Sequence, residues 1–564
     1  MWEEAKEWRC SWSEFDPLDS HPAAINEMIR VDSKLVERYT TLGFWGDRTL
    51  TDVIRRNAGD RPDQFAFIEG AQRMTWRQYD ERSTQIAGAL AEEGFLAGER
   101  VGVQLPDGPD VHAVFVGVEK AGMTVIGLGI RSGEAETRHL LERGEAVGLI
   151  TEREVHGHPA GPIYDRLVSE GLPLRSHLLM PDLKARPLSS DDVAAIVEAR
   201  RIGPNDLYML NSTSGTTGRP KMVMQFQNRW FAFHNMAVDA AELVTDDIFM
   251  CLIPAAYGFA QWTGKFTPTL LGAPTVLMAR FNPESCLELI EKHRVTVLMC
   301  VSTQFIMLLN SPDFRKRDLT SLRCMFTGGE AISADRAAEF ERVTGASVLQ
   351  FFGSNETGAL SYTTLRSDTE TRLRSCGEVI PWMQVRLFDD NMMDVTATGG
   401  PGQPACKGPI TCIGYFKDDE ANAQLFTGDG WMLTGDIVTL EGRILHLVGR
   451  KTDFIIRGGK NISAAAVEMD VGSHAAVALV AAVAMPDAVF GEKVACYVVL
   501  KPGMSLTLRD MQEHLERIGT SIETWPERLI FVESLPLSSG GKVAKAELRN
   551  DIHRRLAEEV DRAQ

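Results

Sequence analysis

The sequence predicts an α/β protein with a large N-terminal domain of mostly parallel, helix-flanked sheets and a small, mobile α+β C-terminal domain. Segments typical of strands and of helices alternate through much of the chain, as expected for parallel sheets covered by helices. The 564 residues exceed what one hydrophobic core serves, so two or more domains are expected. The character of the sequence changes near residues 449–453, and we place the domains at residues 1–449 and 450–564.

The alternation can be followed along the chain. Residues 100–106 predict a buried strand and residues 110–122 a helix, because the first run is short and apolar and the second has helical periodicity. Ser132 is expected to cap the helix at residues 133–144, which follows the strand at residues 124–130. The remaining segments are expected to be strands at residues 124–130, 146–151, 296–302 and 346–353, and helices at residues 133–144, 285–295, 335–345 and 542–560.

Composition excludes several classes of protein. A net charge of −18 argues against a nucleic-acid partner and against docking onto anionic lipid. Nine dispersed cysteines without a CxxC pair favour reduced thiols over a disulfide framework or a zinc site. The apolar run at residues 475–485 is far shorter than the ~20 residues that cross a bilayer, so it predicts a buried strand. The charged N-terminus lacks the apolar core of a signal peptide. We therefore expect a cytoplasmic protein with no membrane span.

The stretch TSGTTGRPK, residues 213–221, is a candidate phosphate-binding loop. Its glycines allow backbone N–H groups to approach an anion, its hydroxyls add donors, and Lys221 adds charge. A solvated turn is the alternative, since Gly, Ser, Thr and Pro all favour loops. The stretch is not a Walker loop, because the GxxxxGK[ST] spacing is absent. It follows a predicted strand, the position where parallel sheets bind ligands.

Five further motifs follow in order: TGGEA (327–331), FFGSNETG (351–358), LTGD (433–436), GRKTDFIIRGGKNIS (449–463) and LPLSSGGKVAKAELR (535–549). With the loop, they resemble the adenylate-forming superfamily of acyl-CoA synthetases, peptide-synthetase adenylation domains and luciferase. Weaker similarity extends back to Met74. The resemblance implies that a carboxylate attacks the α-phosphate of ATP, releasing pyrophosphate, and that the acyl adenylate then passes its acyl group to a thiol. The implied cofactors are ATP, Mg²⁺ and coenzyme A as co-substrate.

The resemblance also assigns a nucleotide site. Glu356 matches the carboxylate associated with magnesium and counts among the catalytic residues, because a hard oxygen ligand suits an ion that bridges phosphates. Asp436 and Arg450 match ribose contacts, and Phe352 can stack on adenine. The other implied ATP or AMP contacts are Thr213, Ser214, Gly215, Thr216, Thr217, Gly218, Lys221, Gly328, Gly329, Glu330, Gly353, Ser354 and Asn355.

The motifs near the C-terminus imply a domain that serves both half-reactions. Lys542 matches the lysine that meets negative charge developing on the α-phosphate, a task suited to a compact ammonium. Gly458 and Gly459 match the loop that lines the coenzyme A tunnel, where glycine permits close backbone approach. Thr452 matches the hinge, although relatives usually have Asp or Lys there. Asn355 replaces the usual Thr, Ala464 the usual Pro, and Lys407 a frequent Arg, and none of these changes removes a required charge.

The acid is expected to be a compact cyclic carboxylate, aromatic or alicyclic. Tyr257 in its Ala-Tyr-Gly context resembles benzoate-type and cyclic-carboxylate CoA ligases. Ala256 and Gly258 are small and leave space for a ring, while Phe305 and Phe351 could supply apolar walls. Ordinary core packing is the alternative for each aromatic residue. A short- or medium-chain fatty acid is the second candidate.

The acceptor is expected to be free coenzyme A, because no carrier domain with an attachment serine follows Arg549. Transfer to a separate carrier protein is an alternative. A nucleotide-binding regulator without turnover is a third hypothesis, against which Lys542 and Glu356 argue. The oligomeric state is left open, with a homodimer among the options.

Overall fold

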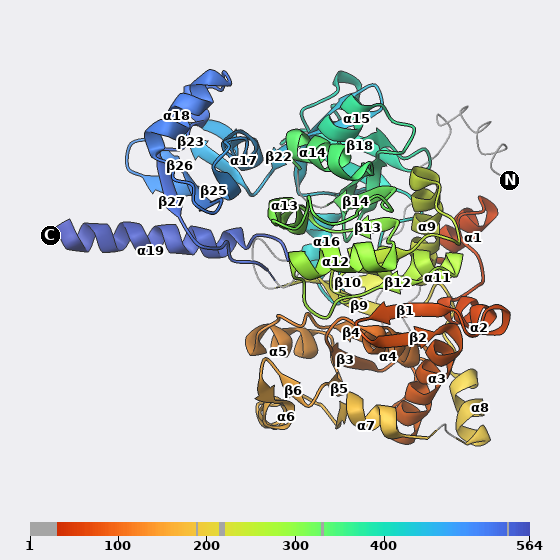
Figure 1. The fold of residues 1–564 in the computed structure, drawn as a ribbon. Coiled ribbons are helices and arrows are strands. Elements are labelled where there is room, and N and C mark those ends of the chain that lie inside the picture. The colour runs from red at the N-terminus through yellow and green to blue at the C-terminus, as the bar shows by residue number, and fades with distance from the viewer. Residues whose placement is uncertain (1–30, 188–189, 214–219, 329–331, 539–540, 564) are drawn as a thin grey trace.

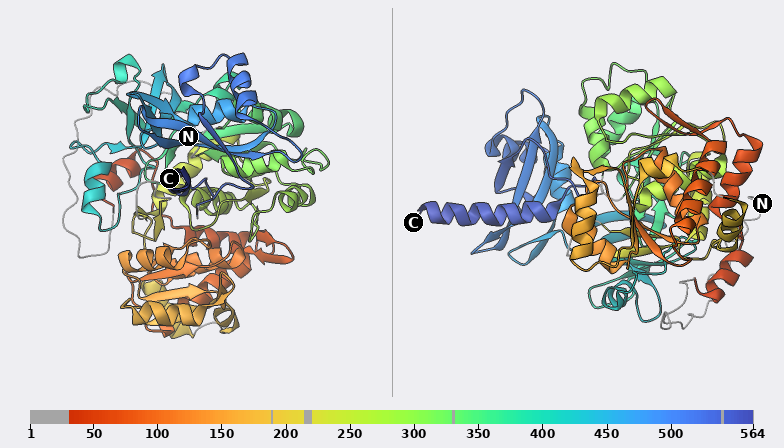
Figure 2. Two further views of the ribbon diagram at one scale, coloured as in Figure 1. Left: turned by 90° about the vertical axis from the view of Figure 1, so that its left-hand side faces the viewer. Right: turned by 90° about the horizontal axis from the view of Figure 1, so that it is seen from below.

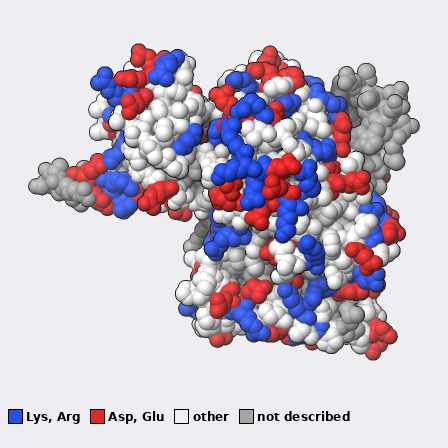
Figure 3. Space-filling view, in the orientation of Figure 1, with Lys and Arg blue, Asp and Glu red and all other residues white. Residues whose placement is uncertain are grey.

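The computed structural model describes residues 31–187, 190–213, 220–328, 332–538 and 541–563. A large body holds two broad sheets, and a smaller domain formed by the last part of the chain lies beside it (Figure 1). The C-terminal helix packs against the smaller domain through its first turns, and Figure 2 shows its far end projecting beyond that domain. Acidic and basic side chains are interspersed over the face drawn in Figure 3.

A six-stranded sheet forms the first layer. Its strands run in the order β10-β9-β4-β3-β5-β8, and all neighbours are parallel except β10 against β9. Apolar residues fill these short strands because both faces of the sheet are covered. The strands are β3 (Arg100–Gln104), β4 (Thr124–Gly127), β5 (Gly148–Thr151), β8 (Ser176–Leu179), β9 (Met209–Ser212) and β10 (Met222–Gln225). The helices in this part of the chain are α1 (Ser33–Thr41), α2 (Leu50–Asp60), α3 (Trp76–Glu92), α4 (Pro109–Lys120), α5 (Glu134–Arg143), α6 (Ala160–Ser169), α7 (Met180–Ala185) and α8 (Asp191–Ala199).

An eleven-stranded sheet forms the second layer, in the order β2-β1-β12-β11-β13-β14-β15-β16-β17-β22-β21. Neighbours from β1 to β15 are parallel, and the edges are antiparallel. The strands are β1 (Phe65–Glu69), β2 (Gln72–Thr75), β11 (Phe249–Cys251), β12 (Thr275–Val276), β13 (Val297–Met299), β14 (Cys324–Gly328), β15 (Ser347–Ser354), β16 (Gly358–Tyr362), β17 (Glu378–Val379), β21 (Asp436–Glu441) and β22 (Ile444–Arg450). The principal helices are α9 (Gln227–Ala241), α12 (Pro283–His293), α13 (Ser302–Asn310), α14 (Ala334–Thr344), α15 (Thr369–Arg374) and α16 (Asp419–Leu425).

The smaller domain is a mixed sheet with helices. Strands β24-β23-β26-β25 are neighbours, and β27 pairs with β26. Its elements are β23 (Phe454–Arg457), β24 (Lys460–Ser463), α17 (Ala464–Gly472), β25 (Val477–Asp487), β26 (Gly491–Leu500), α18 (Leu508–Arg517), β27 (Arg528–Phe531) and α19 (Lys545–Ala563). The last strand of the large sheet ends at Arg450, and the first strand of this domain begins at Phe454.

The α/β fold class is confirmed, with strands and helices in the predicted order. Ser132 is not the helix cap that the sequence suggested: α5 begins one residue later, with Gly133 at its N-cap and no side-chain cap. The described cysteines are all free. No helix in the described residues combines the length and the apolar character needed to cross a membrane.

Candidate active site

The candidate site lies where β14 and β15 end at the carboxyl edge of the large sheet. Gly328 is the last residue of β14, and it pairs with Phe351 of β15. A Cβ atom on Gly328 would lie 2.5 Å from the carbonyl oxygen of Phe351, so only glycine allows this approach. Phe352 follows, half-buried, on the same strand. Gly329 and Glu330 lie outside the described residues.

The loop of residues 213–221 joins the antiparallel strands β9 and β10. Its two ends are closed by backbone N–H of Thr213 donating to the carbonyl of Lys221 at 3.0 Å. The N–H of Lys221 donates in return to the Thr213 hydroxyl at 3.3 Å. Ser214, Gly215, Thr216, Thr217 and Gly218 lie outside the described residues. The described ends therefore form a closed hairpin base from which the predicted phosphate loop extends.

Glu356 lies in the turn between β15 and β16 and contacts the hairpin base through one tyrosine. The Tyr415 hydroxyl donates to Glu356 Oε1 at 2.5 Å, and Lys221 Nζ lies 4.9 Å from the centre of the Tyr415 ring. Burial, with the charge of Glu356, raises the pKa of Tyr415 well above its ordinary value, so the phenol stays a hydrogen-bond donor. Two residues that the sequence assigned to the phosphates thus lie on either side of Tyr415.

The donor set at Glu356 fits magnesium. In the parts of the chain that the structure describes, no three His, Cys, Asp or Glu side chains gather into a metal site. Mg²⁺ in phosphate-transfer enzymes is typically held by one or two carboxylates together with the phosphates and water, so a single carboxylate beside a phosphate loop is enough. Glu356 is the carboxylate that would hold it.

Asp436 and Arg450 face each other across β21 and β22. The two residues are register partners, and Arg450 Nε lies 3.8 Å from Asp436 Oδ1. Burial raises the pKa of the Asp436 carboxyl, and the charges of Arg450 and Lys542 oppose that rise. Lys542 comes from the small domain, just before α19, so this arrangement brings its ammonium group within electrostatic range of the predicted ribose acid.

The segment of residues 252–258 follows β11 and leads into an aromatic cluster. Trp262 stacks on Phe233 with ring centres 4.6 Å apart, and its edge meets the Phe351 ring at 5.0 Å. Phe351 in turn stacks on Phe326 at 5.0 Å. Ala256 and Tyr257 are buried and belong to the same hydrophobic core cluster as these rings. Phe305 is elsewhere: it is fully buried in a separate core cluster, where it packs against Phe340.

Gly258 is the point where the acyl segment meets the phosphate turn. A Cβ atom there would collide with Asn355 Oδ1 and lie 3.4 Å from Asn211 Nδ2. The Asn355 side chain therefore occupies the space that a side chain at position 258 would need. Gly353 has the same constraint, because its Cβ would collide with the carbonyl oxygen of Gly358.

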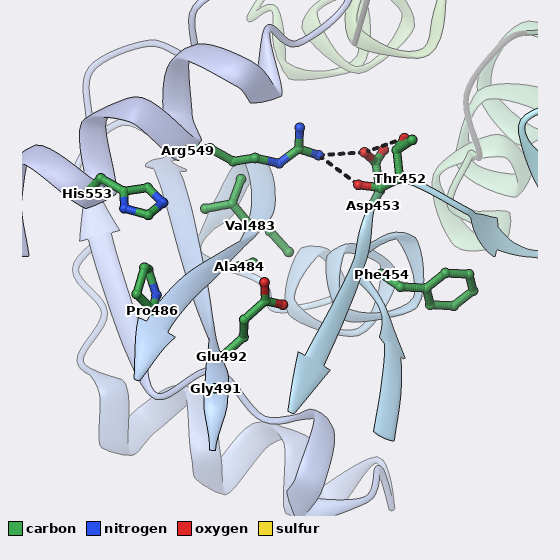
Figure 4. A pocket seen from close by; sticks show the side chains of 11 residues that line it. Thr452, Asp453, Phe454, Val483, Ala484, Pro486, Gly491, Glu492, Arg549 and His553 are labelled. Carbon is green, nitrogen blue, oxygen red and sulfur yellow. Dashed lines mark hydrogen bonds and ion pairs between the residues drawn. The ribbon is translucent and has the colours of Figure 1, made fainter. Parts of the chain in front are cut away.

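Thr452 lies between the two domains, beside a cavity of about 350 Å³ (Figure 4). Arg549 of α19 donates to Asp453 Oδ1 at 2.6 Å and to the Thr452 carbonyl at 3.4 Å. Gly458 and Gly459 form the two-residue turn between β23 and β24, with φ of +57° and +83°. Positive φ at both positions is the geometry of a type I′ hairpin, which explains the paired glycines.

Comparison with known proteins identifies the family of the chain. The AMP-binding enzyme family matches residues 54–416, and the AMP-binding enzyme C-terminal domain matches residues 466–542. The chain belongs to the AMP-binding enzyme family. It is an adenylate-forming ligase, and the family implies the use of ATP.

Relatives of this AMP-binding enzyme act on different acids. It is 29% identical over 539 residues to the medium-chain fatty-acid–CoA ligase of Escherichia coli (strain K12), covering 93% of this chain and 94% of that one. It is 28% identical to the 2,3-dihydroxybenzoate-AMP ligase of Bacillus subtilis (strain 168), covering 93% and 97%. The solved anthranilate CoA ligase AuaEII in complex with anthranoyl-AMP shares its fold with a TM-score of 0.82 at 23% identity, covering 91% and 98%.

Four residues of this AMP-binding enzyme contact the site but escaped the sequence analysis: Asn211, Gln225, Arg229 and Tyr415. Tyr415 lies 59 residues from the glutamate that it contacts. Asn211 and Gln225 stand on the short apolar strands that flank the 213–221 motif, and Arg229 stands in the helix that follows. The one signal in the sequence was a polar residue inside an apolar run, such as Gln225 in MVMQF. A buried amide or guanidinium requires hydrogen-bond partners, so such a residue indicates polar contacts inside the fold.

Trp262 is carried by a π-helical turn, Gln261–Phe266, which also holds a buried lysine. Lys265 Nζ has no hydrogen-bond partner among the described residues, and it lies 5.4–5.7 Å from the ring centres of Phe115, Tyr208 and Phe266. Burial lowers its pKa from 10.5 to about 8, and the charge of Glu119 opposes that change. The ammonium is therefore held mainly by aromatic faces.

This lowered pKa predicts a pH effect on stability. Between pH 8 and 10.5 the unfolded chain keeps the Lys265 proton that the folded protein loses, so stability rises with pH in this window, by about 3 kcal/mol in total. The Lys265→Met variant lacks this contribution. Thermal unfolding of both proteins at pH 7.5 and pH 10 should show the wild type gaining relative to the variant. A constant difference between them would contradict the lowered pKa.

Proposed function

We propose that this AMP-binding enzyme is a carboxylate–CoA ligase that activates a compact cyclic carboxylic acid, aromatic or alicyclic. The observation that carries the proposal is the aromatic cluster around Trp262 and Phe351, which belongs to the same hydrophobic core as Tyr257. Trp262 stands four residues after Gly258, which lies at the Asn355 side chain. Aromatic faces and edges favour a flat ring in offset or edge-to-face geometry. Gly258 does not itself open the space for a ring that the sequence suggested, because the Asn355 side chain occupies that space.

In the first half-reaction a carboxylate oxygen attacks the α-phosphorus, a new O–P bond forms, and the bond to pyrophosphate breaks. Two anions must approach each other, so the protein contributes mainly charge and alignment. Lys542 offsets negative charge at the α-phosphate, Asp436 and Arg450 hold the ribose, and the 213–221 loop with Lys221 holds the outer phosphates. A magnesium ion at Glu356 would add positive charge between phosphates.

In the second half-reaction a thiol sulfur attacks the carbonyl carbon of the adenylate, and the bond to AMP breaks as the thiol gives up its proton. The Gly458–Gly459 turn of the small domain would line the path of the thiol after the domain rotates about Thr452. The small domain would thus present Lys542 in one step and the glycine turn in the other. Residues 1–449 and 450–564 are the two units that this rotation separates.

The relatives support a cyclic acid without excluding a linear one. The names 2,3-dihydroxybenzoate-AMP ligase and anthranilate CoA ligase specify aromatic acids, whereas the E. coli relative is named for medium-chain fatty acids. A linear acid is therefore the second candidate. The B. subtilis name specifies the AMP ligase step alone, which supports transfer to a separate carrier protein as the alternative to coenzyme A.

Acid-dependent exchange of labelled pyrophosphate into ATP tests the proposal. Benzoate, cyclohexanecarboxylate and hydroxylated or aminated benzoates are expected to support exchange at least tenfold better, in kcat/KM, than hexanoate or octanoate, a difference of about 1.4 kcal/mol. Higher kcat/KM for the linear acids would overturn the cyclic assignment. Absence of exchange with every acid would instead favour the nucleotide-binding regulator.

The acceptor is tested separately by product analysis. The best acid is incubated with ATP, Mg²⁺ and either coenzyme A or a phosphopantetheinylated carrier protein, and thioesters are identified by mass spectrometry. Coenzyme A thioester in the first reaction is the expected result. If thioester formed on the carrier protein and not on coenzyme A, the carrier protein would be the acceptor.

A further inference from the structure

Arg229 is a fully buried arginine behind the phosphate-binding edge that the mechanism above does not use. It lies in the first turn of α9 with 0% of its surface exposed. Its guanidinium donates to Gln225 Oε1 at 2.6 Å and to three backbone carbonyls: Ile410 at 3.0 Å, Asn355 at 3.1 Å and Glu356 at 3.3 Å. None of these four acceptors is a carboxylate.

This placement is costly. A buried charge without an ion-pair partner is strongly disfavoured, and burial lowers the pKa of the Arg229 guanidinium. A cation in the first helical turn also opposes the helix dipole, and α9 has no side-chain N-cap to compensate. An apolar residue would avoid both costs. We therefore infer that the buried guanidinium is present to hold the groups to which it donates.

Those groups include both segments assigned to the phosphates. Gln225, which accepts from Arg229, donates to Asn211 Oδ1 at 2.8 Å and to Asn355 Oδ1 at 3.1 Å. Asn355 Nδ2 donates to Asn211 Oδ1 at 2.9 Å. Asn211 and Gln225 belong to β9 and β10, the strands that carry the 213–221 loop. The hydrogen bonds thus run from the phosphate hairpin to the turn that holds Glu356.

We propose that Arg229 is a positioning residue for Mg·ATP, one that clamps the Asn355–Glu356 turn and, through Gln225 and Asn211, joins it to the phosphate hairpin as one rigid unit. The inference rests on the proposed ATP-dependent adenylation. One guanidinium binds the carbonyls of both Asn355 and Glu356 and so fixes the backbone there. The positions from which these two side chains extend are therefore fixed as well. Lysine would reproduce this only in part, because its ammonium group keeps the charge but lacks the planar fork that spans separate acceptors.

The test is binding of Mg·ATP in the absence of acid, measured by calorimetry on the full chain. Arg229→Met is expected to raise Kd about 10–100-fold, the usual effect of removing a group that orients a metal ligand. Arg229→Lys should recover part of the loss. Arg323→Met is the control at the other end of α9, about 20 Å away, where Arg323 donates to the Ala241 carbonyl at 3.1 Å and pairs with Asp247 at 2.7 Å.

The outcomes separate positioning from general stability. Both Met variants are expected to unfold at lower temperature, because each leaves acceptors inside the protein without the donor that satisfied them, and only Arg229→Met should bind Mg·ATP more weakly. Wild-type Kd in Arg229→Met, or equal weakening in Arg323→Met, would overturn the proposal. If Arg229→Met does not fold, Gln225→Met takes its place. Breaking the shared hydrogen-bond network is expected to raise the Kd for Mg·ATP about fivefold. An unchanged Kd in this variant would contradict the proposal. Failure of the wild type to bind Mg·ATP would instead contradict the proposed adenylation.

Discussion

Lys542→Ala is expected to lower the rate of acid-dependent pyrophosphate exchange by about 10²–10³-fold, the cost of removing one group that stabilises developing charge. The loss follows because no other cation of the small domain is assigned to the α-phosphate. Transfer from supplied acyl adenylate to coenzyme A should remain within threefold of wild type, since Lys542 then faces away from the reacting atoms. Both rates are measured on the same preparations by quenched flow.

The matched control for Lys542 is Lys292→Ala, at an exposed position in the last turn of α12. It removes the same charge without touching the site, and both half-reactions should keep wild-type rates. Equal loss of both half-reactions in Lys542→Ala would refute the assignment of this lysine to adenylation alone.

Gly459→Trp is expected to have the opposite selectivity. Transfer from supplied adenylate to coenzyme A should fall by about 10²-fold, because displacing reacting groups by about 1 Å already has an effect of that size. Pyrophosphate exchange should change little, since a Cβ atom on Gly459 meets no heavy atom within 4 Å in the present arrangement. A Cβ atom has open space here, so we expect the indole to obstruct only when the turn lines the thiol path. Single-turnover measurements of each half-reaction check this.

Backbone strain must be separated from obstruction, because Gly459 has a φ of +83°. Gly503→Trp is the control: it lies in the same domain, has a φ of +75° and also meets nothing within 4 Å. Strain alone would cost about 1–2 kcal/mol of stability in both variants. If Gly503→Trp slowed thioester formation as much as Gly459→Trp, the glycine turn would have no special role in the second step.

Most of the fold could be predicted from local patterns. Apolar runs predicted the strands at residues 100–106 and 475–485, which the structure places at 100–104 and 477–487. Helical periodicity predicted the helix at residues 110–122, which the structure places at 109–120. The helix cap at Ser132 was wrong because capping depends on the backbone angle of one residue, which composition does not set. The antiparallel pairing of β10 with β9 was also not predicted, because direction depends on the connection.

The site was predicted where its residues stand in contiguous motifs. The structure brings Asp436 beside Arg450 and ends β14 at Gly328, next to Phe351. Phe305 was named from its aromatic character alone, and the fold places it with Phe340 in another cluster. Tyr415 and Arg229 act through contacts with residues 59 and 127 positions away, which no local pattern can reveal.

The order of short motifs by itself determined the family and, through it, the implied use of ATP, because phosphate chemistry requires particular groups in particular loops. Tertiary structure alone decided which polar residues hold those loops in place: a guanidinium buried in α9, two amides on a hairpin and a tyrosine from a distant segment. The physical reason is that a buried polar group is defined by the partners that satisfy it, and those partners are brought together only when the chain folds.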